Sequence, residues 1–332
     1  MPLARRGGPR RDRQVKKRHG STREVRQMSP TTRWLSAAVA AVFCALLAVN
    51  SGVILAGPKA AEKSGNLELF RLYGFCMEVS DAKRRSLPDQ ANMLRELGFD
   101  GAGYPLWLDE KLDQNLKILD EAKLPVYLLW TSINLKPGAQ PFDPRVFDAI
   151  KKLKGRPVTI SVLLQGLPPA DPRGMDAAVK LLRDLGNAAA EAGLRISIYH
   201  HTGDWAESFP FAVKLVRQVD HPRVGLNFNL CHWLMIEGDK DYRPMLQANA
   251  AKIFAVTLNG AQIGAKTWTN GLIQPLDTGN FDNRQLLATL REIGYTGPVG
   301  LMCFGIPGDA REHLQRSMQV WKRWQASSNR DQ

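Results

Sequence analysis

The chain has 332 residues, of which 44% are hydrophobic, and it carries a formal net charge of +13. That apolar content is enough for a sizeable buried core, so it excludes a chain that is disordered throughout. The length suits one large barrel or two smaller domains. A net positive charge indicates a nucleic-acid partner only if it is spread over the folded part. The position of the Lys and Arg residues in the chain therefore decides whether such a partner is expected.

The positive charge is concentrated at the N-terminus. Residues 1–33 hold 11 Lys and Arg against Asp12 and Glu24, a net +9, so the rest of the chain contributes only +4. A segment rich in Arg, Gly and Pro without aromatic side chains cannot bury a core. We therefore predict a disordered basic cytoplasmic tail over 1–33, and no nucleic-acid partner for the nearly balanced remainder.

An uncharged apolar segment follows this tail, over residues 35–56. About 20 apolar residues span a bilayer as a helix, and a basic flank stays cytoplasmic. We predict a transmembrane anchor or signal segment over 34–56 rather than a buried helix of a soluble domain. Ile54-Leu-Ala56 lacks the small residue that a cleavage site needs, which favours an uncleaved anchor over a secreted, cleaved product. In both cases the following domain lies on the extracytoplasmic (periplasmic) side.

A polar linker over 57–67 leads into a domain over 68–326, where apolar runs alternate with amphipathic stretches. Eight strand–helix units in about 265 residues match a (β/α)8 TIM barrel, which typically takes about 250. The competing doubly wound sheet would carry a Gly-rich phosphate loop after an early strand, and the sequence has none. The predicted strands are 71–77, 99–104, 125–131, 157–164, 195–201, 224–230, 253–259 and 298–304. The predicted helices are 82–97, 109–122, 143–154, 174–193, 206–218, 241–250, 282–294 and 308–325.

Three segments carry motifs of a known family. Residues 279–298 read Gly-Asn-Phe-Asp, a predicted helix, then Gly-Tyr-Thr-Gly-Pro, and residues 224–232 read Val-Gly-Leu-Asn-Phe-Asn-Leu-Cys-His. Residues 99–104 read Phe-Asp-Gly-Ala-Gly-Tyr. With these motifs the chain resembles the xylose isomerase-like TIM barrel superfamily, which contains sugar-phosphate isomerases and epimerases and family-2 apurinic endonucleases. The resemblance implies a sugar isomerase or epimerase acting at the carboxyl ends of the strands.

The resemblance also implies a divalent cation held by Glu, Asp and His side chains, but the matching positions have changed here. His232 is retained, whereas the other positions hold the neutral residues Tyr104, Tyr199, Asn229, Thr257, Asn259 and Met302. A divalent cation needs anionic ligands to offset its lost hydration. We therefore expect no cofactor and no metal site of the family type. Weak binding of Mn²⁺, Mg²⁺ or Zn²⁺ stays open, with Glu78 and Asp204 as nearby carboxylates.

Neutral polar side chains at the strand ends suggest a carbohydrate ligand. Hydroxyl and amide groups offer the donors and acceptors that sugar hydroxyls need, although the same groups could instead satisfy the backbone of the barrel end. Alternation along each strand places these side chains on the inner face. The predicted substrate-binding residues are Tyr199, Asn227, Asn229, Thr257, Asn259 and Gln165.

Tryptophans at or just after the predicted strand ends point the same way. An indole face packs against the C–H face of a sugar while its N–H stays available. Each Trp alone is better explained as ordinary packing, but five at one rim favour a ligand role. These residues are Trp107, Trp130, Trp205, Trp233 and Trp268.

His201 and His232 are the predicted catalytic residues, because histidine exchanges protons near neutral pH. A proton shift next to a sugar carbonyl needs a base, an acid and donors for the enediolate oxygen. We assign His201 as base, His232 as acid, and Asn229 with Asn259 as donors. Purely structural histidines are the alternative, and His200 should face the barrel wall.

Three cysteines, Cys76, Cys231 and Cys303, fall near predicted strand ends. The first and eighth strands of a barrel are neighbours, so a Cys76–Cys303 disulfide is one possibility in an exported protein. Buried free thiols in the barrel wall are the preferred prediction.

Two functions remain from the sequence: an exported sugar isomerase or epimerase that works without the usual metal, and a membrane-tethered barrel that binds a carbohydrate without chemistry. A DNA-repair endonuclease is disfavoured, because it would need a metal cluster and a basic face for phosphate.

Overall fold

Eight short strands form the centre of the computed structural model, which describes residues 70–328. They are all parallel, pair in sequence order, and close into a barrel. Their register joins the first strand to the last, from Leu72 opposite Val299 to Phe75 opposite Met302. The strands are β1 (Leu72–Phe75), β2 (Gly101–Pro105), β3 (Val126–Asn134), β4 (Thr159–Gln165), β5 (Arg195–Tyr199), β6 (Val224–Asn229), β7 (Ile253–Leu258) and β8 (Val299–Met302).

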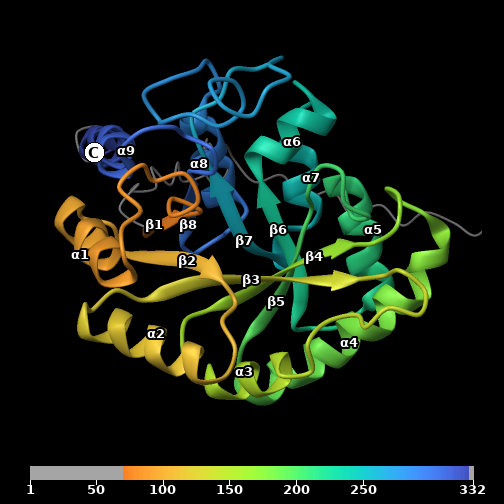
Figure 1. The fold of residues 1–332 in the computed structure, drawn as a ribbon. Coiled ribbons are helices and arrows are strands. Elements are labelled where there is room, and N and C mark those ends of the chain that lie inside the picture. The colour runs from red at the N-terminus through yellow and green to blue at the C-terminus, as the bar shows by residue number, and fades with distance from the viewer. Residues whose placement is uncertain (1–69, 329–332) are drawn as a thin grey trace, which may run out of the picture. The chain divides into compact units, whose positions relative to one another are not determined.

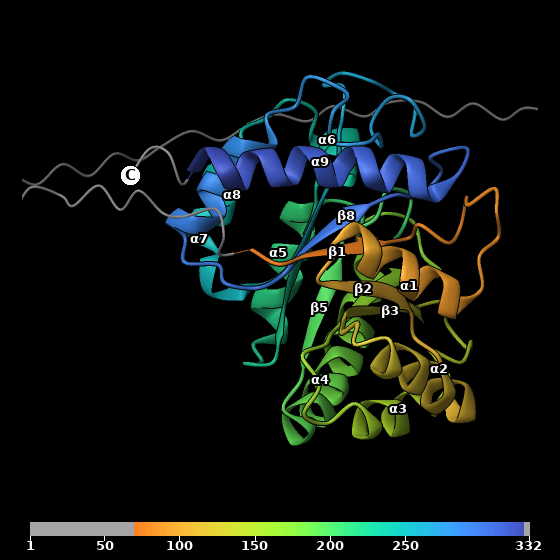
Figure 2. The ribbon, with the colours of Figure 1, turned by 90° about the vertical axis from the view of Figure 1, so that its left-hand side faces the viewer.

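Helices follow the strands and cover the outside of the barrel. Figure 1 shows α2, α3 and α4 around the outside of the early strands, and Figure 2 shows α9 lying across the barrel close to α1. The α-helices are α1 (Leu87–Leu97), α2 (Asp109–Glu121), α3 (Val146–Lys152), α4 (Met175–Ala192), α5 (Phe209–Val219), α6 (Leu230–Glu237), α7 (Arg243–Ala248), α8 (Asn283–Glu292) and α9 (Ala310–Ser328). Short 3-10 turns are η2 (Pro172–Gly174) and η3 (Ala250–Lys252).

The predicted (β/α)8 barrel is confirmed, and all eight predicted strands are present within a few residues. Helix α4 ends before Gly193, whose φ of 73° lies in the left-handed region that closes helices. The predicted strand over 224–230 matches β6, and Cys231 and His232 follow its end. Helix α6 over residues 230–237 was not predicted, and it places both residues in its first turn. Residues 230–236 are apolar except for His232, so no helical period separates one face from the other.

Aromatic side chains fill the barrel interior where neighbouring strands carry glycine. The ring of Tyr73 lies against Gly103 and Gly300, where a Cβ atom would come within 3.0 and 2.7 Å of it. Above this layer, the hydroxyls of Ser161 and Ser197 are 2.6 Å apart. Bulky side chains opposite glycines fill the barrel as a packed core, so only its carboxyl end is open to a ligand.

The N-terminal predictions lie outside the described residues: the basic tail over 1–33, the membrane segment over 34–56 and the linker over 57–67. Within residues 70–328, no helix combines the length and the hydropathy needed to cross a bilayer.

A buried carboxylate joins the β1–α1 loop to the start of α9. The Asp81 side chain, 2% exposed, pairs with Arg85, which also contacts Asp309 at 2.7 Å. Asp81 accepts the backbone N–H groups of Lys83, Arg85 and Ala310 as well. Burial alone would raise the pKa of Asp81, but these hydrogen bonds hold it below its ordinary value. Asp81 therefore links the start of α9 to the β1–α1 loop.

Three loops at the carboxyl end of the barrel meet at Gly305. Its N–H donates to Oγ of Ser80 in the loop after β1, at 3.1 Å. Its carbonyl accepts from Oγ1 of Thr269 in the loop after β7, at 3.0 Å. The loops after β1, β7 and β8 are thus linked directly.

Replacing Asp81 by Asn should lower the free energy of unfolding by about 2–4 kcal/mol at pH 7, because buried donors lose their acceptor. Urea unfolding measures this change. Since the pKa of Asp81 is lowered by folding, the difference from wild type should shrink as the pH falls below about 4. The control is Asp143→Asn, whose partner Arg145 is 53% exposed, and it should change nothing measurable. Equal effects of the two variants would contradict this role of Asp81.

Candidate functional site

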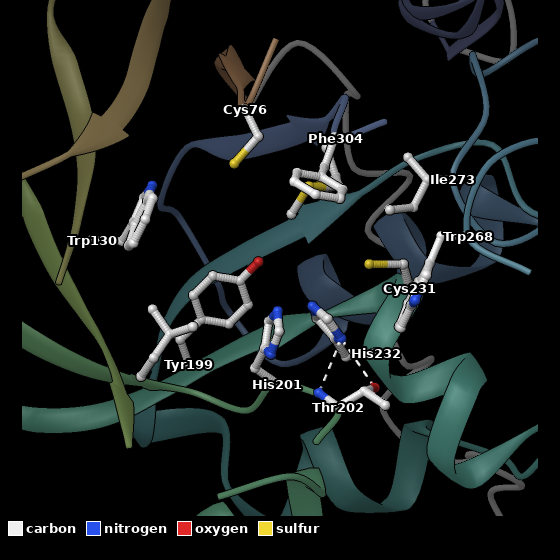
Figure 3. A pocket seen from close by; sticks show the side chains of 12 residues that line it. Cys76, Trp130, Tyr199, His201, Thr202, Cys231, His232, Trp268, Ile273 and Phe304 are labelled. Carbon is white, nitrogen blue, oxygen red and sulfur yellow. Dashed lines mark hydrogen bonds between the residues drawn. The ribbon is translucent and has the colours of Figure 1, made fainter. Parts of the chain in front are cut away.

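A cavity of about 270 Å³ opens at the carboxyl ends of the strands. This volume is slightly below the range of roughly 300–1,000 Å³ that is typical of small-molecule pockets. Figure 3 shows aromatic rings, two histidines and two thiols around it. The lining residues are Cys76, Trp130, Leu163, Tyr199, His201, Thr202, Cys231, His232, Trp268, Ile273, Met302 and Phe304.

The ring of His232 is held by Thr202, in the loop after β5. Its Nδ1 lies 3.2 Å from the backbone N of Thr202 and 3.1 Å from the Oγ1 of that residue (Figure 3). A backbone N–H can only donate, so Nδ1 accepts and the ring proton lies on Nε2. Burial, and then the proximity of His201 and His200, lower the pKa of His232 well below its ordinary value. The hydrogen bond and the burial both favour a neutral imidazole that offers its Nε2–H as a donor, and the acid role of His232 stays a prediction.

His201 is the more accessible of the two, with its side chain 36% exposed. Its ring centroid lies 4.2 Å from that of His232. Nδ1 of His201 is 3.4 Å from Oδ2 of Asp204, an ion-pair distance without good hydrogen-bond alignment. Catalytic hydrogen bonds are often this loose in a free protein. Burial lowers the pKa of His201, and the Asp204 carboxylate partly offsets that shift. The site thus favours a neutral His201 imidazole with Asp204 beside it, and its role as the base stays a prediction.

Gln165 positions this pair instead of facing a ligand. Its Nε2 lies 3.2 Å from both carboxylate oxygens of Asp204. The contacts run from Gln165 to Asp204 to His201, so Gln165 and Asp204 together orient the His201 imidazole.

The predicted amide layer exists, and the amide nitrogens of its three asparagines bond within the protein. Asn229 donates to the hydroxyl of Tyr199 at 2.8 Å and accepts from the thiol of Cys231 at 3.0 Å. Asn227 donates to Ser161 at 3.1 Å. Asn259 donates to the carbonyls of Gly260 and Leu272. Of the predicted polar residues only Tyr199 lines the pocket; Asn227, Asn229, Thr257, Asn259 and Gln165 do not. The side-chain oxygens of Asn227, Thr257 and Asn259 are buried without a hydrogen-bond partner, so the layer is only partly satisfied within the chain.

The predicted tryptophan rim divides into two groups. Trp130 and Trp268 line the pocket, and the Trp268 ring lies 5.1 Å from that of His232. Trp205 is fully buried, bonded through its N–H to the carbonyl of Asp171 at 2.7 Å. Trp233 is also buried, and its N–H donates to the carbonyl of Lys240. Trp107 packs on Tyr104 at 5.1 Å. Trp107, Trp205 and Trp233 thus pack within the protein and are not among the residues that line the pocket, and a ligand role for them stays a prediction.

Two further predictions about single residues can be checked. His200 is buried beside Phe209 and accepts the backbone N–H of Asn229 at 3.1 Å, which confirms that it faces the wall. Cys76, Cys231 and Cys303 are free thiols, so the buried-thiol prediction holds and the Cys76–Cys303 disulfide is wrong.

Sequence reasoning missed Thr202, Phe304 and the pairing of His201 with Asp204. The spacing of Asp204 three residues after His201 was the available signal for that pair. Phe304 lies two residues after the end of β8 and is 47% exposed at the pocket mouth. The contact between His232 and the backbone of Thr202 depends on how close the ends of β5 and β6 lie. No local sequence pattern encodes that distance.

The residues at the family's metal positions do not fit a divalent cation. In the part of the chain that the structure describes, no group of three or more His, Cys, Asp or Glu side chains is placed to hold a metal ion. Tyr199, His232 and Met302 lie in the pocket without a carboxylate among them, and the Nδ1 of His232 is already occupied by Thr202. Hard cations bind through charged oxygens, which this lining lacks.

Comparison with known proteins agrees with the geometry. The family described as xylose isomerase-like TIM barrel matches residues 92–324, and the chain belongs to this family. A 3-dehydroshikimate dehydratase of Pseudomonas putida is 32% identical over 127 residues, which cover 37% of this chain and only 20% of that protein.

Solved structures share the fold at low sequence identity. The IOLI protein with a bound zinc atom is 18% identical, with a TM-score of 0.58, covering 78% of this chain and 98% of the other. The D-allulose 3-epimerase of Methylomonas sp., in complex with D-allulose, is 16% identical, with a TM-score of 0.57, covering 76% and 96%.

The hydrogen bond from Thr202 predicts the state of His232. Its imidazole should stay neutral, with the proton on Nε2, from pH 8 down to pH 5. Nitrogen-15 NMR of the labelled histidines measures this, and the His232→Gln variant identifies the signal. A titration midpoint near 6.5, or a proton on Nδ1, would show that the described contact is absent in solution.

Proposed function

We propose that the barrel is a metal-independent isomerase or epimerase of a neutral keto-sugar. The observation that carries this proposal is the placement of His201 and His232 in one pocket, with ring centroids 4.2 Å apart and different roles. His201 has an acidic partner and a free ring nitrogen, which suits a base. His232 is a fixed neutral donor, which suits a carbonyl oxygen.

The lining of the pocket supports a neutral ligand. None of the residues that line it is Lys or Arg, so among the described residues there is no cation in place for a phosphate or carboxylate group. Trp130 and Trp268 offer indole faces for the C–H surface of a sugar. D-allulose, bound in the structure of the Methylomonas epimerase, is a neutral ketose of this kind.

The proposed step is proton transfer beside the carbonyl. Nε2 of His201 removes a proton from the carbon next to the carbonyl, and the electron pair of that C–H bond forms the C=C bond of an enediol. The carbonyl oxygen takes up negative charge and accepts a hydrogen bond from Nε2–H of His232. The new imidazolium of His201 is stabilised by the Asp204 carboxylate and returns its proton to carbon in the product.

A carbohydrate-binding barrel without catalysis is the second candidate. The observation that favours it is that no carboxylate lines the pocket directly, whereas the family's reaction is implied to need several. The two candidates make different predictions for hydrogen exchange, because only catalysis exchanges the proton next to the carbonyl.

Catalysis predicts that D-allulose incubated with the protein in D2O exchanges the proton next to its carbonyl, in the presence of EDTA. Proton NMR follows the exchange. His201→Gln should slow it by at least about 100-fold, because general-base catalysis contributes roughly 10²–10⁴. The control His221→Gln alters a histidine outside the pocket and should leave the rate unchanged. Binding of D-allulose without exchange would favour the carbohydrate-binding barrel without catalysis. Loss of exchange on addition of EDTA would show that the reaction needs a metal ion.

The pH dependence of this exchange follows from the base. The imidazole of His201 must be neutral, and its pKa lies below 6.5, so exchange should fall as the pH drops through a midpoint under 6.5. Asp204 raises that pKa, so Asp204→Asn should move the midpoint to lower pH. If the midpoint of the pH dependence is the same in Asp204→Asn as in wild type, Asp204 has no role in the mechanism.

We further propose that residues 34–56 anchor the protein and that the barrel faces the extracytoplasmic side, because a basic segment precedes an uncharged apolar one. The full chain in bacterial cells should fractionate with membranes, and added protease should digest the barrel in spheroplasts. Deletion of residues 34–56 should abolish both results. A barrel protected from protease until the cells are lysed would contradict this orientation.

A further inference from the structure

We propose that Tyr199 is a catalytic residue that donates its O–H to the carbonyl oxygen of the sugar, and that Asn229 and Cys231 are positioning residues that turn this O–H into the pocket. This inference rests on the proposed function and adds a second donor to the one that His232 supplies. Asn229 was itself predicted as a donor for the enediolate oxygen, but its amide N–H bonds the hydroxyl of Tyr199. The donor role therefore passes from the amide to the hydroxyl that it holds.

The direction of the hydrogen bonds around Asn229 carries the inference. Nδ2 of Asn229 lies 2.8 Å from the Tyr199 hydroxyl, and Oδ1 lies 3.0 Å from Sγ of Cys231. A thiol sulfur is a weak acceptor and a phenol oxygen is a better one, so the amide turns its N–H to Tyr199 and its oxygen to Cys231. The Tyr199 oxygen therefore accepts from Asn229, and its own proton is left for another partner.

That proton has no acceptor in the described part of the protein. Between residues 70 and 328 the Tyr199 hydroxyl bonds only to Asn229. Tyr199 is buried against the protein, yet it lines the pocket. Figure 3 shows its hydroxyl end turned toward the cavity, next to the rings of His201 and His232. A ligand in the cavity is therefore the acceptor that this O–H can reach.

The network behind Tyr199 is fully buried and fixed from three sides. Asn229 and Cys231 have no exposed surface, and the backbone N–H of Asn229 donates to Nε2 of His200 at 3.1 Å. Asn229 is thus held at its backbone and at both ends of its amide. Burial raises the pKa of Tyr199 and of Cys231, so both groups keep the protons that they donate at neutral pH. The hydroxyl is therefore oriented before a ligand arrives.

Two donors on one oxygen suit the proposed proton transfer. The centre of the Tyr199 ring lies 5.7 Å from that of His232 and 5.9 Å from that of His201. As His201 takes the proton from carbon, the electron pair of the C–H bond forms the C=C bond and negative charge develops on the carbonyl oxygen. The O–H of Tyr199 and Nε2–H of His232 both donate to that oxygen, and neither loses its proton. Donors fixed in this way stabilise the developing charge without reorienting.

The test of the donor is hydrogen exchange of D-allulose in D2O, compared between wild type and Tyr199→Phe. Loss of one fixed donor costs roughly 10²–10³ in rate, so Tyr199→Phe should slow exchange about 100-fold. Binding of D-allulose in calorimetry should change by less than about fivefold, because the donor acts mainly on charge that develops in the transition state. The matched control is Tyr295→Phe, which removes a hydroxyl that bonds the carbonyl of Pro298 and does not line the pocket. It should exchange at the wild-type rate.

The positioning role is tested by rescue and by a double variant. Cys231→Ala removes the donor to Asn229 and should slow exchange roughly threefold or more. Cys231→Ser keeps a donor at that position and should restore most of the rate. In the Tyr199→Phe background Cys231→Ala should have no further effect, because Cys231 acts on the ligand only through Asn229 and Tyr199. Additive effects of the two substitutions would overturn the positioning role.

The remaining outcomes separate this inference from the proposed function. If Tyr199→Phe exchanges at the wild-type rate, or loses binding together with exchange, Tyr199 is not a donor in the transition state and the proposed function stands. If wild type exchanges nothing, the proposed function is contradicted, and carbon-13 NMR of labelled tyrosine decides the donor alone. The Cζ signal of Tyr199, assigned with Tyr199→Phe, should move when D-allulose is added, and an unmoved signal would overturn the hydrogen bond to the ligand.

Discussion

Closure of the sheet between β1 and β8 is the constraint on which the site depends. Their pairing, from Leu72–Val299 to Phe75–Met302, brings residues more than 200 positions apart into one wall. Only in a closed barrel do the ends of β1 and β5 face each other across a single cavity. Below the cavity, rings such as that of Tyr73 pack against glycines and fill the interior. The accessible polar side chains of the barrel interior therefore lie at its carboxyl end.

The electrostatic character of the pocket comes from burial rather than from charges. Burial lowers the pKa of His232 and of His201, so two imidazoles can lie 4.2 Å apart without repelling each other. A metal site would instead need carboxylates at Tyr199, Asn229 and Met302, and each of these residues now packs or bonds as a neutral group. The pocket lining offers neutral N–H and O–H groups, which need no counter-ions.

The sequence was sufficient to predict the fold because each element carries its own local signal. Apolar runs of strand length and helix stops such as Gly193 recur along the chain, and the barrel follows from their alternation. The histidine pair was also predictable, since His201 and His232 follow consecutive strands.

The partners of the polar side chains were not predictable. Asn229 and Asn259 look identical in sequence whether they bond a sugar or a backbone carbonyl, and the choice depends on atoms 13 to 30 residues away. The partner of Trp205 could not be predicted for the same reason: its indole N–H bonds the carbonyl of Asp171, 34 residues earlier. Helix α6 was missed because an all-round apolar helix carries no amphipathic period.

Three loops meet at Gly305 on one side of the barrel mouth. Ser80, Thr269 and Phe304 belong to these loops, which are linked to one another by hydrogen bonds to the backbone of Gly305. The opposite rim, from His201 to Glu207, is also linked across strands: Gln165 bonds Asp204, Thr202 bonds His232, and the indole of Trp205 bonds Asp171. The rim is thus cross-linked on both sides, so a substitution in one loop affects loops that follow other strands.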